Sequence, residues 1–334
     1  MKHEIIITAQ GHKGTLERLQ QEFSATRLWE AADRDAALKA AAPRVRALAH
    51  FGHSKVDGKL MDALPKLEII SNFGVGVDQI DLEAAKKRKI IVTNTPNVLN
   101  DCVADCAMAL VLNTLRKFPQ SQDHLRSGFW PSRGPYPLAT SIGGKTLGIL
   151  GLGRIGEAIA RRALSFGMKI RYYNRNKKDV PYAYDADLVT LAKNSDVLLI
   201  VTPGGAETAK LVNAKVLDAL GPQGYVVNVA RGTVVDEAVL LRYLQEKKIA
   251  GAGLDVWEEE PPPSTHPLMK FDNVLVSPHT AGATVESREN MSRFAAEQVL
   301  DILDGKRPPR LINPEVWPAY RQRFAAIMGF EPEA

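Results

Sequence analysis

The sequence predicts an α/β protein made of two lobes, each built on a parallel sheet. Three observations lead to this fold class. Short β-branched runs alternate with longer helical patterns along the whole chain. A length of 334 residues is enough for two domains of ordinary size. The most specific glycine motif begins only at Gly151, after a long stretch of the same alternation, so one lobe must precede it.

The predicted strands are short apolar runs bounded by turn residues. Two of them, Thr146–Leu150 and Val197–Thr202, are almost continuously apolar, which is typical of strands covered on both faces. In chain order the predicted strands are Ile5–Thr8, Leu67–Asn72, Ile90–Thr93, Thr146–Leu150, Lys169–Tyr173, Val197–Thr202, Tyr225–Val229, Ala252–Val256 and Val274–Ser277. The helical patterns are Asp33–Ala42, Leu82–Arg88, Val103–Leu115, Ile155–Phe166, Asp187–Asn194 and Asp236–Glu246.

The end of the chain predicts a domain made of two separate segments. A long helical pattern from Val285 to Leu303 follows the last strand and can return the chain to the first lobe. We therefore expect residues 1–99 and 284–334 to form a substrate-binding domain, and residues 100–283 to form an inserted dinucleotide-binding domain. The segment Ser127–Gly144, rich in Gly, Pro and aromatic residues, is expected to be an exposed loop. The tail after Asp304 has too few apolar residues for a third domain.

Composition and charge exclude several classes of protein. Apolar residues make up 45% and charged residues 24%, which is typical of a globular chain with a full core. The formal charge of +5 comes from dispersed residues, and the runs 86–89 and 247–248 lie at predicted helix ends, where the helix dipole favours cations. The sequence contains no basic helical pattern with interleaved aromatic residues, which would indicate nucleic-acid binding. The positive balance also suits a small anionic substrate or a phosphorylated cofactor.

The cysteines and the start of the chain point to an intracellular protein. Cys102 and Cys106 lie four residues apart on one helical face, and no second Cys or His pair follows at a spacing typical of metal ligands. We expect buried, reduced thiols and no metal. The apolar run after Met1 is too short for a signal peptide, and no stretch approaches the roughly 18 apolar residues that span a bilayer. A cytoplasmic protein without membrane attachment is expected.

A glycine motif joins the predicted strand Thr146–Leu150 to the following helix. Its sequence is Gly151-Leu152-Gly153-Arg154-Ile155-Gly156. In this context the first glycine permits a tight turn, the second lets backbone approach a pyrophosphate, and the third lets helix and strand pack closely. The helix N-terminus adds N–H groups and a positive dipole. The motif therefore predicts a dinucleotide site.

The next strand indicates which dinucleotide binds. An acidic residue about 20 positions after the motif holds the ribose hydroxyls in NAD-binding proteins. Here the strand Lys169–Tyr173 is followed by Asn174 and Arg175 instead. A guanidinium can bind the 2′-phosphate of NADP in a bidentate manner, so we predict a preference for NADP(H) over NAD(H). The alternative is that Arg175 is a solvated loop residue and Asn174 serves NAD.

Three strand ends deliver an arginine, a glutamate and a histidine to one edge of the predicted sheet. Arg231, Glu260 and His279 each follow a separate strand, and ligands of parallel sheets bind beyond the carboxyl ends of the strands. An arginine binds a carboxylate or a polarised carbonyl, a histidine transfers protons, and a glutamate orients the imidazole and favours its protonated form. Alone, each residue has a structural alternative as a cap, a solvated acid or a turn residue. Together they predict a catalytic site.

These motifs resemble those of the D-isomer-specific 2-hydroxyacid dehydrogenases, most of all their NADPH-dependent glyoxylate/hydroxypyruvate reductase branch. The resemblance covers nearly the whole chain, from Asn72-Phe73-Gly74-Val75-Gly76-Val77-Asp78 to Ser277-Pro278-His279-Thr280-Ala281-Gly282. It implies a homodimer of two-lobed subunits with the substrate in the cleft. It implies that Arg231 holds the substrate carboxylate and carbonyl oxygen, that His279 is the acid/base, and that Glu260 is its partner.

The resemblance also implies further binding residues. Backbone N–H groups of Val75 and Gly76 are expected to cradle the substrate carboxylate. Besides the glycine motif and Asn174–Arg175, the residues expected to line the cofactor are Val103, Arg154, Ile155, Thr202, Pro203, Thr208, Val229, Ala230, Arg231, Asp255, His279 and Gly282. The expected dimerisation region is about 103–144, including the helix Val103–Leu115 and the loop Trp130–Tyr136. Which of Trp130 and Tyr136 narrows the partner's pocket stays open.

The expected reaction is the NADPH-dependent reduction of glyoxylate or hydroxypyruvate to a D-2-hydroxy acid. One alternative is a related dehydrogenase for a larger acid, such as a 2-ketogluconate or an aryl pyruvate. A second alternative is a dinucleotide-sensing protein similar to the corepressors of the same fold family.

Overall fold

The computed structural model describes residues 2–11, 13–52 and 54–332, apart from the side chain of residue 327. It divides into two compact units. Unit 1 comprises Met1–Val98 and Thr284–Ala334, and unit 2 comprises Leu99–Ala283. Unit 1 contains a five-stranded sheet and unit 2 a seven-stranded sheet, and every strand pair in both is parallel. The predicted α/β class with two parallel sheets is confirmed.

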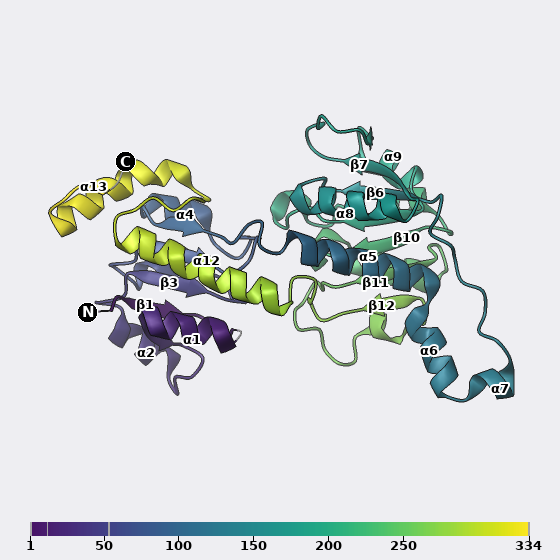
Figure 1. Cartoon of the computed structure of the whole chain (residues 1–334), viewed down its shortest axis with the longest axis horizontal. Helices are drawn as coiled ribbons and strands as arrows, with labels where there is room; N and C mark the ends of the chain where they lie inside the picture. Colours follow the sequence, from purple (N-terminus) through teal and green to yellow (C-terminus); the bar gives the residue numbers. More distant parts are fainter. Residues whose placement is uncertain (1, 12, 53, 333–334) are drawn as a thin grey trace. The chain divides into compact units, whose positions relative to one another are not determined.

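Unit 1 is built from both ends of the chain, drawn purple to blue and yellow in Figure 1. Its strand order is β2-β1-β3-β4-β5. The first segment contributes β1 (Glu4–Ile7), α1 (Lys13–Glu22), β2 (Ser24–Arg27), α2 (Arg34–Ala41), β3 (Ala47–His50), α3 (Gly58–Asp62), β4 (Ile69–Asn72), α4 (Leu82–Lys87) and β5 (Ile91–Thr93). The second contributes α12 (Val285–Leu303), the 3-10 turn η4 (Pro314–Val316) and α13 (Trp317–Met328).

Helices cover both faces of this sheet because its strands are apolar on both sides. Ile5 and Ile7 of β1 pack with α1, α12 and α13, whereas Ile6 packs with α2, α3 and α4. A strand buried in this way places alternate side chains in two separate cores. The carboxyl end of β4 is thereby held between β3 and β5 and against α12.

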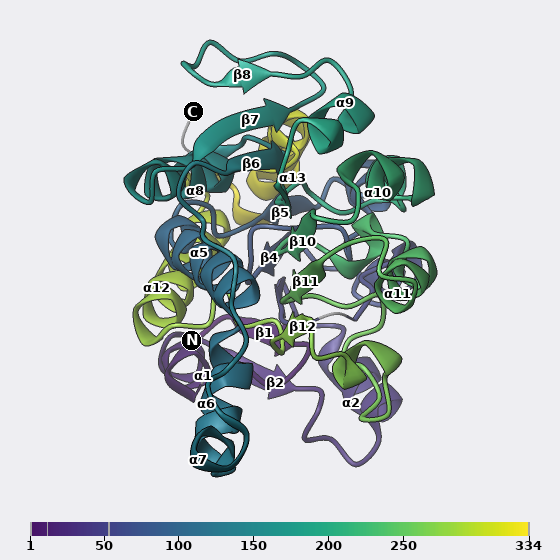
Figure 2. The ribbon, with the colours of Figure 1, turned by 90° about the vertical axis from the view of Figure 1, so that its right-hand side faces the viewer.

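Unit 2 has the strand order β12-β11-β10-β9-β6-β7-β8. Helices α5 and α8 pack on one face of the sheet and α9, α10 and α11 on the other, as Figure 2 shows. Its helices are α5 (Asn100–Arg116), α6 (Phe118–Arg126), α7 (Phe129–Arg133), α8 (Arg154–Ser165), α9 (Leu188–Lys193), α10 (Ala214–Leu220) and α11 (Glu237–Gln245). Its strands are β6 (Thr146–Leu150), β7 (Lys169–Tyr173), β8 (Ala183–Tyr184), β9 (Val197–Ile200), β10 (Tyr225–Asn228), β11 (Gly251–Leu254) and β12 (Val274–Val276), and its 3-10 turns are η1 (Ala206–Thr208), η2 (Gly232–Val234) and η3 (Pro267–Lys270).

The direction of winding reverses at β6. This strand pairs with β7 on one side and with β9 on the other, although β9 follows β7 and β8 in sequence. The chain segments leaving β6 and β9 therefore diverge at their carboxyl ends. In open α/β sheets this reversal is where ligands bind.

Some sequence predictions need correction. The segment Ser127–Gly144 is not a loop throughout, because α7 forms within it between Gly128 and Gly134, both with positive φ. The two cysteines are half-buried rather than buried. No helix of the part of the chain that the structure describes is long and apolar enough to cross a membrane.

Candidate active site

The glycine loop after β6 shows a different environment at each glycine. A Cβ on Gly151, whose φ is +101°, would lie 2.8 Å from Thr202 Cα, and a Cβ on Gly156 would lie 2.6 Å from the Gly151 carbonyl oxygen. A Cβ on Gly153 would meet no atom within 4 Å. The first and third glycines are therefore required by close packing of the protein itself. The second faces open space, as expected where a ligand approaches the backbone.

The start of α8 fits the same ligand. Gly153 is the N-cap of this 12-residue helix, and no side chain caps its first N–H groups. Such groups, together with the helix dipole, form a site for an anion. The loop and the helix start thus fit the pyrophosphate of a dinucleotide, which the residues 151–156 would hold.

The residues after β7 are bound to neighbouring loops. Asn174 Oδ1 accepts a hydrogen bond from Leu152 N at 2.7 Å, and its Nδ2 donates to Leu152 O at 3.3 Å. Arg175 Nη1 donates to Glu207 Oε2 at 2.6 Å, and both side chains are exposed. The guanidinium predicted to bind a phosphate is thus paired with a carboxylate from η1. This pair was not predicted from the sequence.

The loop after β9 completes the surroundings of the glycine motif. Thr202 abuts Gly151, and Thr208 Oγ1 donates to Pro203 O at 2.8 Å and to Gly205 O at 3.2 Å. The residues predicted here to line a cofactor therefore form one closed turn beside the glycine loop.

His279 and Glu260 form a hydrogen-bonded pair. Their Nδ1 and Oε2 atoms are 2.7 Å apart, and Glu260 Oε1 accepts from Trp257 N at 3.0 Å. The backbone of His279 has φ +52°, a left-handed conformation that is uncommon outside glycine. Its N–H donates to Asp255 O at 2.8 Å. Residues held in such conformations concentrate at functional sites.

Asp255 organises the loop that carries His279. Its carboxylate is fully buried. Oδ1 accepts from Ser277 Oγ at 2.6 Å and from Thr280 N at 2.8 Å, and Oδ2 accepts from Ala281 N at 2.8 Å. Asp255 therefore fixes the chain on both sides of His279. Asp255 was expected to line a cofactor, and this second role was not predicted, although an acidic residue ending an apolar strand is a recognisable signal.

Arg231 follows β10, next to the segment that carries Glu260. Asn228 at the end of β10 accepts from Ala230 N at 3.0 Å and donates to Arg231 O at 2.9 Å, which fixes the turn. A Cβ on Gly232 would lie 1.9 Å from Trp257 C, so the two segments meet backbone to backbone. This contact packs the turn after Arg231 against the segment that leads to Glu260.

A second His–Glu pair packs against the side chain of Trp257. His266 Nε2 lies 2.9 Å from Glu237 Oε1, and His266 Nδ1 accepts from Leu268 N at 3.3 Å. The ring of His266 meets the Trp257 ring edge to face at 5.2 Å. This pair was not predicted, because its partners lie far apart in the sequence.

The other predicted residues lie in several places. Val103 of α5 packs near Gly282, and Val229 and Ala230 are buried after β10. Arg154 and Ile155 open α8. Val75 and Gly76 follow β4 and belong to unit 1.

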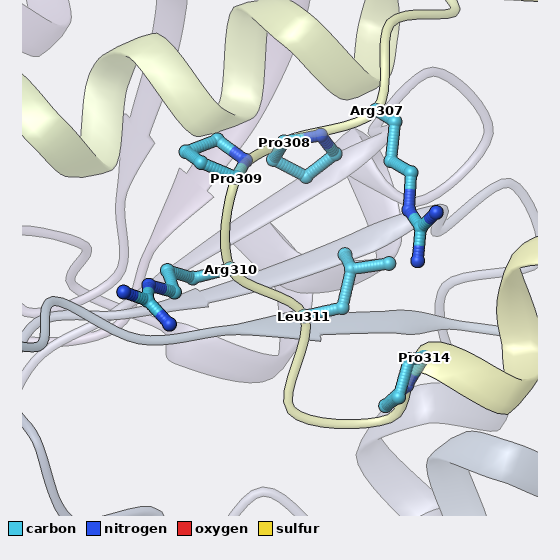
Figure 3. Close-up of a pocket in the computed structure, with 6 residues that line it drawn as sticks. All are labelled: Arg307, Pro308, Pro309, Arg310, Leu311 and Pro314. Atoms are coloured by element: carbon cyan, nitrogen blue, oxygen red, sulfur yellow. The ribbon is translucent and has the colours of Figure 1, made fainter. Parts of the chain in front are cut away.

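We also searched the described residues for a metal site, a reactive thiol and a second binding pocket. Within residues 2–11, 13–52 and 54–332, no three His, Cys, Asp or Glu side chains gather as a metal site would require. Burial, with a smaller contribution from Asp255, raises the pKa of the Cys106 thiol to about 11, so it is protonated and unreactive at neutral pH. A hollow of about 430 Å³ in unit 1 is lined by residues 307–311 and 314 of the segment that connects α12 to α13. Its two arginines, Arg307 and Arg310, extend in different directions (Figure 3), so they do not converge on one anion.

Comparisons with known proteins agree with this geometry. Residues 108–281 match the model of the D-isomer specific 2-hydroxyacid dehydrogenase NAD binding domain. The chain is 44% identical to a glyoxylate reductase of Thermofilum pendens over 269 residues, 78% of this chain and 79% of that protein. It is 43% identical to a 2-ketogluconate reductase of Gluconobacter oxydans over 271 residues, 80% of this chain and 86% of that protein.

A solved structure is similar along the entire chain. It is an NADPH-dependent glyoxylate/hydroxypyruvate reductase from Sinorhizobium meliloti in complex with NADP and malonate. Its sequence is 39% identical, its TM-score is 0.87, and the match covers 100% of both chains. This chain therefore belongs to the D-isomer-specific 2-hydroxyacid dehydrogenase family.

Proposed function

We propose that this protein is an NADPH-dependent reductase that converts glyoxylate and hydroxypyruvate to the corresponding 2-hydroxy acids, the D isomer where one exists. The observation that carries the proposal is the 2.7 Å hydrogen bond between His279 Nδ1 and Glu260 Oε2. It lies on the sheet whose β6–α8 junction carries the dinucleotide glycine loop. The names of the Thermofilum and Sinorhizobium relatives support the same reaction.

His279 and Glu260 provide the proton chemistry. A bound nicotinamide dinucleotide supplies a hydride to the carbonyl carbon. The alkoxide that forms takes a proton from His279, so one hydride and one proton convert the carbonyl to a hydroxyl. Because Nδ1 of His279 is bonded to Glu260, the transferable proton lies on Nε2. Glu260 fixes the ring and balances the charge of its protonated form.

Arg231 and the loop after β4 bind the substrate. The guanidinium of Arg231 holds the carboxylate and the carbonyl oxygen, and it stabilises the negative charge that develops there. Backbone N–H groups of Val75 and Gly76 hold the carboxylate from unit 1. We assign Arg231, Glu260 and His279 as the catalytic residues.

Preference for NADPH is proposed from the residues after β7. The five residues directly after this strand, 174–178, include no carboxylate. The Asn174 side chain is bonded to Leu152. Arg175 would bind the 2′-phosphate after leaving Glu207. The cofactor would further be lined by the residues predicted above on α5, α8 and the loops after β9, β10, β11 and β12.

A homodimer is proposed from the exposed apolar residues of the segment 117–141, which we call the dimer segment. Phe118, Leu125, Trp130 and Leu138 are all more than half exposed, and Leu138 is 99% exposed. Apolar side chains gathered at the surface mark protein–protein contacts. A second copy of the chain would cover them.

The test is a steady-state assay of NADPH and NADH oxidation at 340 nm. Glyoxylate, hydroxypyruvate, 2-ketogluconate and phenylpyruvate are compared as substrates. We expect the highest kcat/KM with NADPH and one of the two small acids. Higher kcat/KM with 2-ketogluconate, the substrate of the Gluconobacter relative's name, would assign a larger acid. No turnover of any 2-oxo acid would favour a dinucleotide sensor.

Variants separate the roles of the site residues. His279→Ala is expected to lower kcat by roughly 100-fold or more, which is the usual contribution of a general acid. His3→Gln, beside Asp304 in unit 1, is the control and is expected to retain kcat. Arg231→Gln is expected to weaken turnover of the 2-oxo acid and leave the Kd for NADPH nearly unchanged. Near-normal kcat in His279→Ala would contradict the assignment.

A further inference from the structure

The loop after β4 has its carbonyl groups fixed by side chains of unit 1. Three successive residues, 74–76, present carbonyl oxygens that each accept a hydrogen bond from a buried neighbour. Asn72 Nδ2 donates to Gly76 O at 2.8 Å and to Gly74 O at 3.3 Å. Asn94 Nδ2 donates to Val75 O at 2.7 Å. The backbone of Thr95 also donates to Gly74 O, at 3.1 Å.

The N–H groups of the same loop are used differently. Gly74 N donates to Thr95 Oγ1 at 3.1 Å. Within the described ranges 2–11, 13–52 and 54–332, the N–H groups of Val75 and Gly76 donate to no protein group. Both residues are half-buried. Two successive N–H donors left over in this way can both donate to one bound anion.

The two asparagines are themselves held firmly. Asn72 ends β4 and Asn94 follows β5, and both are buried. Gln298 of α12 donates to Asn94 O at 3.1 Å, and Ser71 donates to Ala295 O of the same helix at 3.4 Å. The backbone that carries the two asparagines is therefore fixed by the sheet and by α12 before any ligand binds, which lowers the cost of ordering the loop.

We propose that Asn72 and Asn94 are positioning residues that set the carboxylate specificity of this protein. They bind the loop carbonyls, and this leaves the Val75 and Gly76 N–H groups for the substrate carboxylate. The inference rests on the proposed function, which assigns those two N–H groups to the substrate. Without the side-chain amides the carbonyl oxygens of residues 74–76 lose their hydrogen-bond donors. The peptide groups can then rotate, so that carbonyl oxygens rather than N–H groups face the substrate carboxylate and repel it.

Asn313 offers a matched control. It is equally buried, it lies in unit 1, and its side chain also makes two backbone hydrogen bonds at β5, from Val92 N and to Ile90 O, both at 2.9 Å. It does not bond to the loop 74–76. A residue that only supports the fold is expected to behave as Asn313 does.

The experiment compares Asn72→Ala, Asn94→Ala and Asn313→Ala in the full chain. The measurements are the KM for glyoxylate and hydroxypyruvate, the Ki of oxalate, the Kd for NADPH and the Tm. For the first two variants we expect KM and Ki to rise about 10-fold, the usual effect of removing a partner from a buried polar group. The Kd for NADPH is expected to stay within about 2-fold. Asn313→Ala is expected to lower Tm and leave KM and Ki unchanged.

A pH profile adds a readout that a purely structural role does not move. In Asn94→Asp the ionised carboxylate faces Val75 O and is expected to raise KM more than Asn94→Ala does. Lowering the pH protonates this carboxyl, which then donates to Val75 O as the amide did. The KM relative to wild type is therefore expected to recover at acidic pH in Asn94→Asp and not in Asn94→Ala.

Two results distinguish failure of this inference from failure of the proposed function. If wild type reduces 2-oxo acids and the Asn72 and Asn94 variants only lower Tm, with KM and Ki unchanged, the positioning role is wrong. If wild type reduces none, the proposed function fails, and thermal protection by oxalate decides the inference. Protection in wild type that is lost in Asn94→Ala supports it, and no protection in wild type overturns it. If the alanine variants do not fold, Asn94→Asp keeps the size of the side chain and loses its donor to Val75 O, and unchanged KM and Ki in that variant at neutral pH overturn the inference.

Discussion

Glu207 places a carboxylate against the guanidinium that we propose for the 2′-phosphate. Arg175 Nη1 lies 2.6 Å from Glu207 Oε2, and both side chains are mostly exposed. Exposed ion pairs contribute little to stability, so a doubly charged phosphate can displace this carboxylate. The carboxylate nevertheless remains close to the phosphate after displacement. Glu207 is therefore expected to oppose NADPH binding and to leave NADH binding unaffected.

This effect is tested with Glu207→Gln. We expect the Kd for NADPH to fall by about 2- to 5-fold, the range of exposed charge pairs, with the Kd for NADH unchanged. Binding is followed by nicotinamide fluorescence at low salt, because screening weakens such effects. Glu246→Gln, which breaks the exposed pair with Lys248, is the control. Weaker NADPH binding in Glu207→Gln would show that Glu207 orients the Arg175 guanidinium for the 2′-phosphate rather than competing with the phosphate for it.

Single residues differ in how far the sequence could predict them. Arg231, Glu260 and His279 were predicted because each lies in the loop after a recognisable strand, and the structure shows a hydrogen bond between the last two. Glu207 could not be paired with Arg175, because the two loops meet only through the order of β7, β6 and β9 in the sheet. The left-handed backbone of His279 depends on hydrogen bonds with Asp255, which no local pattern indicates.

At the scale of elements, the β6–α8 junction separates glycines required for packing from the one that leaves room for a ligand. Gly153 has φ −88°, which any residue adopts, and open space at its Cβ position. Gly156 has the Gly151 carbonyl oxygen within 2.6 Å of that position. A methyl group added at residue 153 therefore meets solvent or ligand, whereas one added at residue 156 meets protein backbone.

Gly153→Ala and Gly156→Ala form a matched pair. Gly153→Ala is expected to retain Tm and to weaken dinucleotide binding, because the methyl group occupies space needed by the pyrophosphate. Gly156→Ala is expected to lose about 1–3 kcal/mol of stability, as overpacked sites do. Thermal unfolding and fluorescence titration provide the two measurements. A large loss of Tm in Gly153→Ala would contradict the open-space interpretation.

Elements with apolar, β-branched sequences were predicted well. The strands β6 and β7 have the predicted bounds, and α12 begins and ends at the predicted residues. The strands β2 and β3 were missed. The sequence of β2 is Ser-Ala-Thr-Arg and that of β3 is Ala-Leu-Ala-His, so neither contains a run of β-branched apolar residues. They form strands because β1 provides an apolar edge on both sides, which is a tertiary effect.

At the scale of the whole molecule, the dimer segment is the largest gathering of exposed apolar residues that the structure describes along one stretch of chain. Trp130 is 60% exposed and Leu138 almost completely so. Helices α6 and α7 extend beyond the sheet of unit 2 (Figure 1), away from its two cores. The dimer segment buries little of its own surface. We therefore expect contacts with a second copy of the chain to stabilise its conformation.

Charged substitutions test the dimer. Leu138→Lys and Trp130→Glu are expected to shift the protein from dimer to monomer, because each would bury a charge at the interface. Light scattering after size exclusion gives the mass. Val189→Lys, on an exposed position of α9, is the control and is expected to stay dimeric. A monomeric wild type would contradict the proposed homodimer.

The discontinuous unit 1 also has a consequence for synthesis on the ribosome. Ile5, Ile7 and Leu19 share one core with Val299, Tyr320 and Phe324. Residues 99–283 form a continuous unit with its own two cores and can fold as soon as they emerge. The first strand, β1, must wait until about 300 further residues have been translated, with one apolar face uncovered in the meantime. The nascent chain is therefore expected to bind chaperones through β1, and to release them only after α12 and α13 have been translated.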